Sequence, residues 1–264
     1  MSHGDLENAL KLSRSGENLF DAQADPNYAS MNGMFGGWTS AVLLRAVCCE
    51  VDGEATPSAL TVNFVGKVEP GSDAQIRTRR VGGGRSVSHW QSELTVDGIT
   101  LAVGFAVLTE RRDSDGHVEV KMPNAPDPAE LEVTYPAPGP CGTRASVRPI
   151  VGFPPGNNLE STYSSSWVSE TSGRAVDHVQ LAFLADHRAP RSFFWGDGPR
   201  PSSTLTLSVY FHATERELAA VGDDEVLSEA FGVRGAQSTS EEHLRLWSRT
   251  GALLASSVQM AWYR

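Results

Sequence analysis

Apolar positions recur with a helical period in two stretches of the chain, residues 39–51 and 176–189. Each stretch is followed by segments in which apolar and polar residues alternate, the pattern of half-buried antiparallel strands. These segments are residues 60–64, 74–81, 86–96 and 100–108 in the first half, and 204–212, 225–233, 238–248 and 253–262 in the second. The repeated order predicts an internal duplication with α+β architecture, in which each unit is one helix followed by an antiparallel meander.

The final strands of the two halves can be aligned residue by residue. Eight positions separate Gly98 from Ala106, and eight separate Gly251 from Gln259. This register places Gln259 where the first half has Ala106. A continuous β-sandwich is the structural alternative, and the two helical stretches in matching places disfavour it.

Proline marks the boundary between the halves. Nine of the 15 prolines fall between Pro123 and Pro155, and this interval has little periodic apolar pattern. Such a segment is typical of a long connection. We therefore divide the chain into an N-terminal unit (residues 1–112), a proline-rich connection (113–160) and a C-terminal unit (161–264).

Composition and charge narrow the class of protein. The 264 residues are 40% hydrophobic and 20% charged, which is ordinary for a soluble globular protein. The net charge of −10 argues against nucleic acid or an anionic membrane as the main partner. The chain shows neither a signal peptide nor an apolar stretch of about 18 residues, and its three cysteines include no CxxC pair. We expect a cytoplasmic protein without a membrane segment, a disulfide framework or a zinc knuckle.

Asp186 is the most informative candidate for chemistry. On a helix over residues 176–189, Val179, Ala182 and Phe183 lie seven, four and three positions before it and share its face. The carboxylate is therefore expected to point at a core or cleft, where an unpaired charge is costly. Such an acid is kept for a partner or for chemistry, unless it ends the helix and reaches solvent.

Two polar residues of the second half are candidates to join Asp186. Gln259 is the one long polar side chain on a strand face made otherwise of alanine and serine, so its amide needs hydrogen-bond partners. Thr204 begins a strand, and taken alone it is an ordinary strand threonine. A carboxylate, a hydroxyl and an amide that converge can hold and activate a water molecule, with the carboxylate accepting its proton.

Phe35-Gly36-Gly37-Trp38 precedes the first helix. Glycines let a ligand approach the backbone, and the amides of a helix N-terminus attract negative charge, although a tight loop entering a helix has the same sequence. Four arginines surround the glycine turn at 82–84, and we interpret them as a charged hairpin surface, because the spacing of a phosphate-binding loop is missing. The chain has no GxSxG or HExxH motif and its histidines are scattered, so we expect neither a serine hydrolase of that type nor a metal site.

Together these motifs resemble the acyl-CoA thioesterase II family, and the resemblance covers most of the chain. The resemblance rests on Phe35-Gly36-Gly37, the strand Leu-Thr-Val-Asn-Phe at 60–64, Ala185-Asp186, Ser203-Thr204 leading toward Phe211-His212, and Ala255-Ser-Ser-Val-Gln259. It implies a double hot dog: two tandem helix-plus-antiparallel-sheet units that form one continuous curved sheet around two central helices.

The resemblance also implies an activity. In this family an Asp, a Thr and a Gln bind and activate the hydrolytic water, and the matching residues are Asp186, Thr204 and Gln259. We therefore expect hydrolysis of acyl-CoA thioesters, a place in fatty acid metabolism, and no metal or redox cofactor. Asp186 is expected to act as general base, while Thr204 and Gln259 position the water.

The resemblance places the oxyanion and substrate-binding groups at Gly36, Gly37 and Trp38, through their backbone amides. The family often has glutamine where this chain has Trp38. The segment after Asp186, His187-Arg-Ala-Pro190, is polar where many members carry an apolar stretch. These departures concern acyl specificity more than the reaction type.

Two other functions remain open. An acyl-CoA-binding protein without catalysis would keep the resemblance while the three polar groups fail to converge. A hot-dog hydratase or dehydratase would use a His–Asp or His–Glu pair at a C=C bond, and no histidine is obviously placed for one.

Association is predicted from the last strand. Its outer face carries Leu254, Val258, Met260 and Trp262, an apolar stripe that a monomer rarely exposes. We expect a homo-oligomer, unless a loop such as the proline-rich connection covers this face.

Overall fold

The computed structural model of the chain describes residues 5–135, 139–153, 156 and 158–264. Its first half holds the elements that the hydrophobic pattern predicts: helix α2 (Gly36–Cys48) and strands β5 (Ala55–Phe64), β6 (Asp73–Gly83), β7 (Val87–Val96) and β8 (Ile99–Glu110). Helix α2 begins at Gly36 instead of the predicted position 39. The two glycines therefore form the first turn of the helix and not a loop before it.

The second half repeats this order with α3 (His178–Leu184), β11 (Ser202–Phe211), β12 (Val226–Ala236), β13 (Thr239–Trp247) and β14 (Leu253–Tyr263). Helix α3 is shorter than the predicted stretch 176–189. Asp177 caps its start by accepting a hydrogen bond from the Gln180 backbone amide, and the helix ends at Leu184 with Ala185 as its C-cap. Asp186 follows the helix, so the prediction that it lies on a helix face was wrong.

The hydrophobic pattern does not predict several further elements. They are α1 (Leu6–Ala9), β1 (Ser13–Gly16), β2 (Leu19–Gln23), η1 (Pro26–Tyr28), β3 (Ala29–Ser30), β4 (Gly33–Met34), η2 (Pro128–Glu130), η3 (Pro140–Thr143), β9 (Ala145–Val151), β10 (Ser164–Glu170), η4 (Arg191–Phe193) and α4 (Glu215–Val221). Strand β1 is polar and mostly exposed, and β10 begins with three serines, so neither has the alternation of a half-buried strand.

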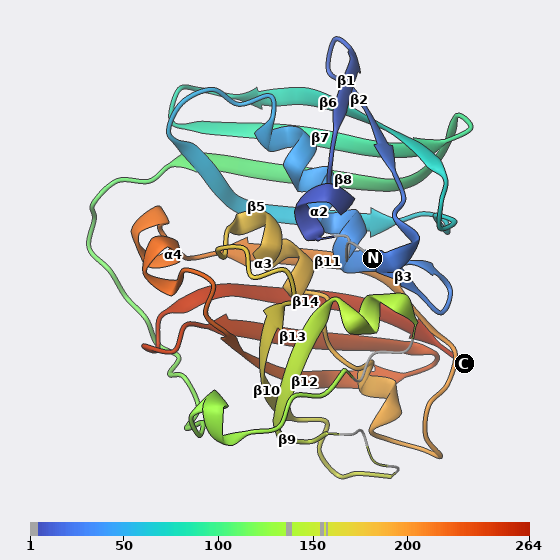
Figure 1. Cartoon of the computed structure of the whole chain (residues 1–264), viewed down its shortest axis with the longest axis vertical. Coiled ribbons are helices and arrows are strands. Elements are labelled where there is room, and N and C mark those ends of the chain that lie inside the picture. The colour runs from blue at the N-terminus through green and yellow to red at the C-terminus, as the bar shows by residue number, and fades with distance from the viewer. Residues whose placement is uncertain (1–4, 136–138, 154–155, 157) are drawn as a thin grey trace.

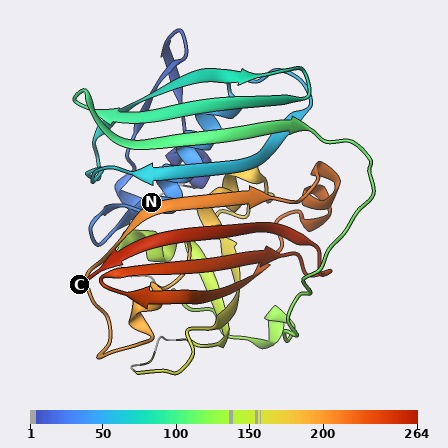
Figure 2. The same cartoon turned by 180° about the vertical axis from the view of Figure 1, so that it is seen from behind.

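One antiparallel sheet of twelve strands organises the described part of the chain, in the order β1-β2-β6-β7-β8-β5-β11-β14-β13-β12-β10-β9. Strands β5 and β11 pair at its centre and join the two halves. Helices α2 and α3 pack against each other on one face of this sheet (Figure 1), and the opposite face is turned to the viewer in Figure 2. This twelve-stranded sheet, with α2 and α3 packed on one face, rules out the β-sandwich and confirms the α+β class. No helix among the described residues is long and apolar enough to cross a membrane.

The strand registers of the two halves correspond. Leu60 of β5 pairs with Ala106 of β8, and Leu207 of β11 pairs with Gln259 of β14. The predicted alignment of the final strands, with Gln259 at the place of Ala106, is therefore confirmed.

Both central strands are also irregular at the same place. The register shifts between Pro57 and Ala59 in β5, and between Thr204 and Thr206 in β11. An extra residue in a strand re-aims the side chains around it. Pro57 lies three positions before Leu60, and Thr204 lies three positions before Leu207. The two residues are therefore equivalent in the two halves.

The main core lies between the sheet and the two helices. Trp38, Leu43, Leu44 and Phe183 are fully buried there. A second apolar cluster of Trp167, Leu227 and Trp247 is covered by side chains of the proline-rich connection, among them Val120, Met122 and Leu131.

The outer face of β14 differs in part from the predicted stripe. Val258, Met260 and Trp262 lie on this face, as expected, and are half-buried. Leu254 is fully buried in the main core instead, because the β13–β14 register shifts between Leu246 and Trp247 and turns it inward.

Candidate functional site

The N-terminus of α2 packs closely against the last turn of α3 and the residues that follow it. A Cβ atom on Gly36 would lie 2.7 Å from Oδ2 of Asp186, and a Cβ atom on Gly37 would lie 2.4 Å from the carbonyl oxygen of Phe183. Only glycine therefore fits at these two positions without displacing a neighbour. The N-cap residue Phe35 offers no side-chain hydrogen bond, so the first amides of α2 lack the usual side-chain acceptor. A buried carboxylate thus reaches the uncapped end of a helix.

Asp186 is only 7% exposed. Burial raises the pKa of its carboxyl from 3.8 to about 7. The positive charge of Arg188 and a hydrogen bond from the Gly37 backbone lower this pKa, whereas the negative charge of Glu242 raises it. The expectation that this acid faces the interior is confirmed. A carboxyl with a pKa near neutrality can give up and take back a proton at physiological pH, as a general base requires.

Thr204 and Gln259 come together across the β11–β14 pair. Nε2 of Gln259 donates a hydrogen bond to Oγ1 of Thr204 over 2.8 Å, and Oε1 of Gln259 accepts one from Nη2 of Arg188. Gln259 is buried and Thr204 is half-buried. The amide that the sequence places on a small-residue face is therefore hydrogen-bonded at both of its ends. Arg188 is the common neighbour of this pair and of Asp186.

Arg188 and Glu242 are part of this region and were not among the predicted site residues. Their side chains are 2% and 1% exposed and form an ion pair, with 3.5 Å between Nε and Oε2. Two signals could have identified them: the polar segment directly after Asp186, and the place of Glu242 on the same strand face as Leu244 and Leu246. A glutamate on the apolar face of a strand is costly to bury unless its charge has a partner.

Trp38 contributes to the site only through its backbone. Its side chain is fully buried, and its indole nitrogen donates to the Ala9 carbonyl oxygen over 2.9 Å. The ring therefore anchors the N-terminal segment onto α2. Its amide belongs to the first turn of this helix together with those of Gly36 and Gly37.

Two further ionisable side chains lie beside Asp186 in space or sequence. Burial lowers the pKa of His187 to about 4, so this imidazole is neutral at pH 7. Burial raises the pKa of the Cys141 thiol to about 11, and the negative charge of Asp186 adds to this effect. Helix η3 of the connection thus packs beside the carboxylate. Among the described residues, no three His, Cys, Asp or Glu side chains are grouped to hold a metal ion.

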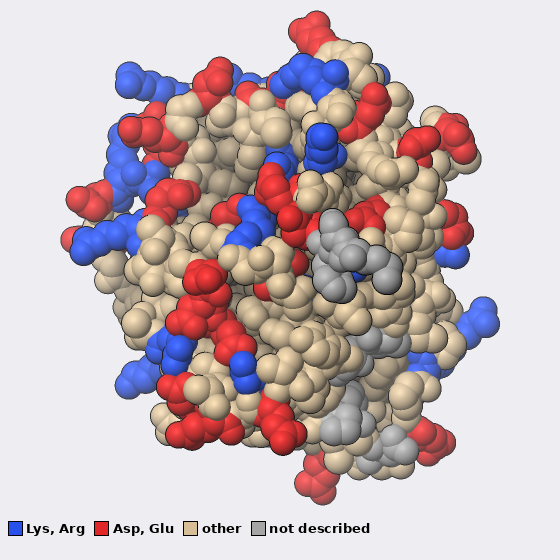
Figure 3. Space-filling model, viewed as in Figure 1, with Lys and Arg blue, Asp and Glu red and all other residues tan. Residues whose placement is uncertain are grey.

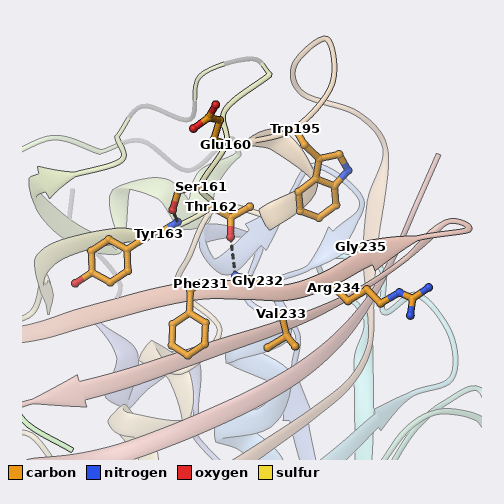
Figure 4. Close-up of a pocket in the computed structure, with 10 residues that line it drawn as sticks. All are labelled: Glu160, Ser161, Thr162, Tyr163, Trp195, Phe231, Gly232, Val233, Arg234 and Gly235. Carbon is orange, nitrogen blue, oxygen red and sulfur yellow. Dashed lines mark hydrogen bonds between the residues drawn. The ribbon is translucent and has the colours of Figure 1, made fainter.

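A cavity of about 310 Å³ lies elsewhere, at the end of β12 (Figure 4). It is lined by residues 160–163, Trp195 and residues 231–235, and none of the predicted site residues lines it. Its floor borders the candidate site indirectly, because Gly232 pairs with Glu242 and packs against Arg191.

The arginines around the glycine turn at 82–84 are Arg77, Arg79, Arg80 and Arg85, and all four are exposed. Arg79 donates to Gln91 over 2.6 Å, and Arg80 donates to the Gly84 carbonyl oxygen over 3.0 Å. Basic and acidic side chains are interspersed over the face seen in Figure 3. These contacts fit the predicted charged hairpin surface.

Several solved structures resemble this one along nearly their whole length. A hot-dog-fold protein of unknown function from Alicyclobacillus acidocaldarius is 30% identical, with 98% of this chain and 97% of that chain covered and a TM-score of 0.93. The acyl-CoA thioesterase II TesB2 of Mycobacterium marinum is 18% identical, with 98% of each chain covered and a TM-score of 0.75. The tesB protein of Mycobacterium avium subsp. paratuberculosis is 20% identical, with 98% of each chain covered and a TM-score of 0.79. The last two show a common fold. No curated protein matches the chain.

Sequence families give a more specific result. Residues 25–109 match the acyl-CoA thioesterase N-terminal domain, and residues 119–263 match the acyl-CoA thioesterase C-terminal domain. These two matches cover most of the chain, and the second includes residues 119–160 of the proline-rich connection. The resemblance inferred from short motifs is thereby confirmed, and the chain belongs to the acyl-CoA thioesterase family, whose solved neighbours have the hot-dog fold.

Proposed function

We propose that the protein hydrolyses acyl-CoA thioesters to a free acid and coenzyme A with an activated water molecule. The observation that carries the proposal is the buried Asp186 carboxyl, with a pKa of about 7, at the uncapped N-terminus of α2. The hydrogen-bonded pair of Thr204 and Gln259 shares Arg188 as a neighbour with it. Family membership supports the substrate class.

In the proposed first step, Asp186 acts as general base. Its carboxylate takes a proton from the water while the water oxygen forms a bond to the thioester carbonyl carbon. The Thr204 hydroxyl and the Gln259 amide orient the water, which removes much of the entropic cost of the attack.

The carbonyl oxygen becomes negative in this step, and the first-turn amides of α2, at Gly36, Gly37 and Trp38, are proposed to stabilise it. Losing one such donor typically costs about 10²–10³ in rate. The Gly37 amide already interacts with the Asp186 carboxylate. As the carboxylate takes its proton, this interaction weakens, and the amide is released toward the developing oxyanion.

In the second step the tetrahedral intermediate collapses. The carbonyl double bond forms again, and the carbon–sulfur bond breaks to release the coenzyme A thiolate. A thiol has a pKa of about 8.5, so the thiolate is a competent leaving group near neutrality. The proton held by Asp186 passes to the thiolate or to solvent, which regenerates the base.

We also propose that the chain is a double hot dog, with units at residues 1–112 and 161–264 joined by the connection at 113–160. The equivalent registers and strand irregularities of β5 and β11 support two equivalent units. The homo-oligomer, the cytoplasmic location and the role in fatty acid metabolism stay predictions. Light scattering that shows a monomer would contradict the first.

A hydrolysis screen over acyl-CoAs of graded chain length, with the free thiol as readout, tests the proposed reaction. Release of thiol in proportion to the amount of protein is the expected result. A protein that only binds acyl-CoA would give heat in calorimetry and no thiol. A hydratase would consume the double bond of an enoyl-CoA and release no thiol. Either of these outcomes overturns the proposal.

A further inference from the structure

The ion pair of Arg188 and Glu242 is buried, with its side chains 2% and 1% exposed. Removing two charges from water is costly, and replacing a buried ion pair with apolar residues is often neutral or stabilising. Stability alone is therefore a weak reason for this pair. Its place next to Gln259, with which Glu242 pairs across the β13–β14 ladder, points to another reason.

Arg188 holds the strand that carries Gln259. Its Nη1 donates to the Ala185 carbonyl oxygen over 2.9 Å and to Oγ of Ser257 over 3.0 Å, while its Nη2 donates to Oε1 of Gln259. A guanidinium has donors only, so the Gln259 amide must turn its oxygen toward Arg188. Its nitrogen is then left facing Thr204, where it donates over 2.8 Å.

The direction of this hydrogen bond decides what Thr204 can do. Because Oγ1 of Thr204 accepts from the Gln259 nitrogen, the Thr204 hydroxyl hydrogen is available for another acceptor. With the amide flipped, its oxygen would face Thr204 and compete for that hydrogen. The guanidinium thus selects one of two arrangements of the Gln259–Thr204 pair.

We propose that Arg188 is a positioning residue for the hydrolysis: held by Glu242, it fixes the orientation of the Gln259 amide and, through it, the Thr204 hydroxyl. This inference rests on the proposed function. Glu242 is itself held in place, because its Oε1 accepts a hydrogen bond from the Arg191 backbone amide over 2.9 Å. A series of contacts therefore connects Arg191 to Glu242, Glu242 to Arg188, Arg188 to Gln259, and Gln259 to Thr204.

Arg188 also acts on the charge of Asp186. The groups that face this carboxyl are Arg188 from its own segment, Glu242 from β13, Cys141 from η3 and the Gly37 amide from α2. Arg188 lowers the pKa of Asp186 and so opposes the effect of burial. Loss of the guanidinium is therefore expected to move the acidic limb of the activity profile to higher pH.

The paired variant Arg188→Met with Glu242→Gln tests the proposal without leaving one charge buried alone. Gln at 242 keeps an oxygen for the Arg191 amide. We expect kcat to fall by about tenfold to a hundredfold with a smaller change in KM, because a misplaced catalytic group costs about this much. The acidic limb moves to higher pH, because Arg188 affects the pKa of Asp186 more than Glu242 does. Circular dichroism and urea unfolding establish that the variant is folded.

Two companion variants separate positioning from a merely structural role. Arg188→Lys keeps the charge and loses the planar fork, so the acidic limb should stay in place while kcat still falls. In a Gln259→Ala background, the paired change should add little further loss, because the residue through which Arg188 acts is already gone. A folded paired variant with wild-type kcat and pH profile overturns the proposal, and so does an equal loss in the Gln259→Ala background.

The outcomes also separate this inference from the proposed function. Thiol release by the wild type, abolished in Asp186→Asn and unchanged in the paired variant, supports the function and rejects the role of Arg188. If the wild type releases no thiol, the proposed function fails. A carbon-13 NMR titration of the Asp186 carboxyl, assigned with Asp186→Asn, then tests the remaining claim, and an unchanged pKa in the paired variant rejects it.

Discussion

The N-termini of α2 and α3 occupy corresponding places in the two halves, yet they are finished differently. Phe35 gives α2 no side-chain cap, and two glycines open its first turn to the Asp186 carboxylate. Asp177 caps α3 instead: one of its carboxylate oxygens accepts a hydrogen bond from the Gln180 backbone amide over 2.7 Å, and the other accepts one from the Arg174 guanidinium over 2.6 Å. One helix end is satisfied by its own sequence, while the other is left open to a group from elsewhere.

The strands that follow these helices in the sequence also differ between the two halves. The strand registers show which positions of the two halves are equivalent. Pro57 corresponds to Thr204, Ala106 to Gln259, and Trp90 to Glu242. In the first half these positions hold proline, alanine and tryptophan, and in the second half they hold a hydroxyl, an amide and a carboxylate. The fold of one unit does not require Thr204, Gln259 and Glu242, because the first half has the same strand registers without this set of polar side chains. We infer that the polar set was kept for chemistry, and the following changes test this difference.

Replacing the acid at the open end is expected to have the largest effect. Asp186→Asn removes the proposed general base and keeps the shape of the side chain, so kcat should fall by about 10²–10⁴. Turnover of acyl-CoA with thiol detection measures it. Asp177→Asn is the matched control, because asparagine is an equally good cap. Turnover near the wild-type level in a folded Asp186→Asn protein rules out the base assignment.

Thr204→Val is expected to have the next largest effect. Valine keeps the shape and removes the hydroxyl that accepts from Gln259, so kcat should fall by about tenfold to a hundredfold through loss of orientation. Thr61→Val is the control, because Thr61 bonds to Ser208 on the central strands and lies outside the candidate site. Equal losses in the two variants would show that the effect is one of general strand stability.

The pH dependence should follow the Asp186 carboxyl. Its pKa of about 7 predicts that kcat rises roughly tenfold per pH unit below neutrality and levels off above it, because only the ionised form is a base. Stability should change in the opposite sense. Since burial raises the folded pKa above the unfolded value, the stability contributed by this group is present below about pH 4 and is lost as pH rises through about 7.

Asp186→Asn cannot ionise, so this variant should gain in Tm over the wild type as the pH rises from 4 to 8. Thermal unfolding of both proteins over this range checks the sign. A constant difference in Tm across the range would show that the carboxyl has an ordinary pKa in the folded protein, and the open end of α2 would then resemble the capped end of α3.

How far the sequence predicts this structure depends on the kind of signal. Alternating strands with glycine turns are local, so the correspondence of Gln259 with Ala106 follows from counting. The end of α3 does not, because the apolar run before Asp186 continues the helical pattern although the helix ends at Leu184. The burial of Asp186 is nevertheless as expected. Packing against α2 buries this carboxylate, whereas the sequence predicted burial by an apolar helix face.

Arg188 and Glu242 show a different limit. The sequence marks Glu242 by its apolar strand face and Arg188 by its place after Asp186, but only the pairing of β13 with β14 and the turn after α3 bring them together. A contact between residues 54 positions apart leaves no periodic trace in the sequence. The amide hydrogen bond that fixes Gln259 is likewise a property of packing. The proposed catalytic residues could therefore be identified from motifs, whereas the contacts that hold them could not.

The smallest effect is expected at the capped end. Asp177→Ala removes the α3 cap and the partner of Arg174, and should cost about 0.5–2 kcal/mol in the free energy of unfolding measured with urea. Thr214→Ala, which breaks the capping box of α4, sets the scale for a cap lost elsewhere in the chain. Because the Asp177 carboxylate is engaged by the Gln180 backbone amide and by Arg174, kcat should stay near the wild-type value. If Asp177→Ala instead lost turnover as Asp186→Asn does, the two helix ends would be catalytically alike, and the polar set on β11, β13 and β14 would need another explanation.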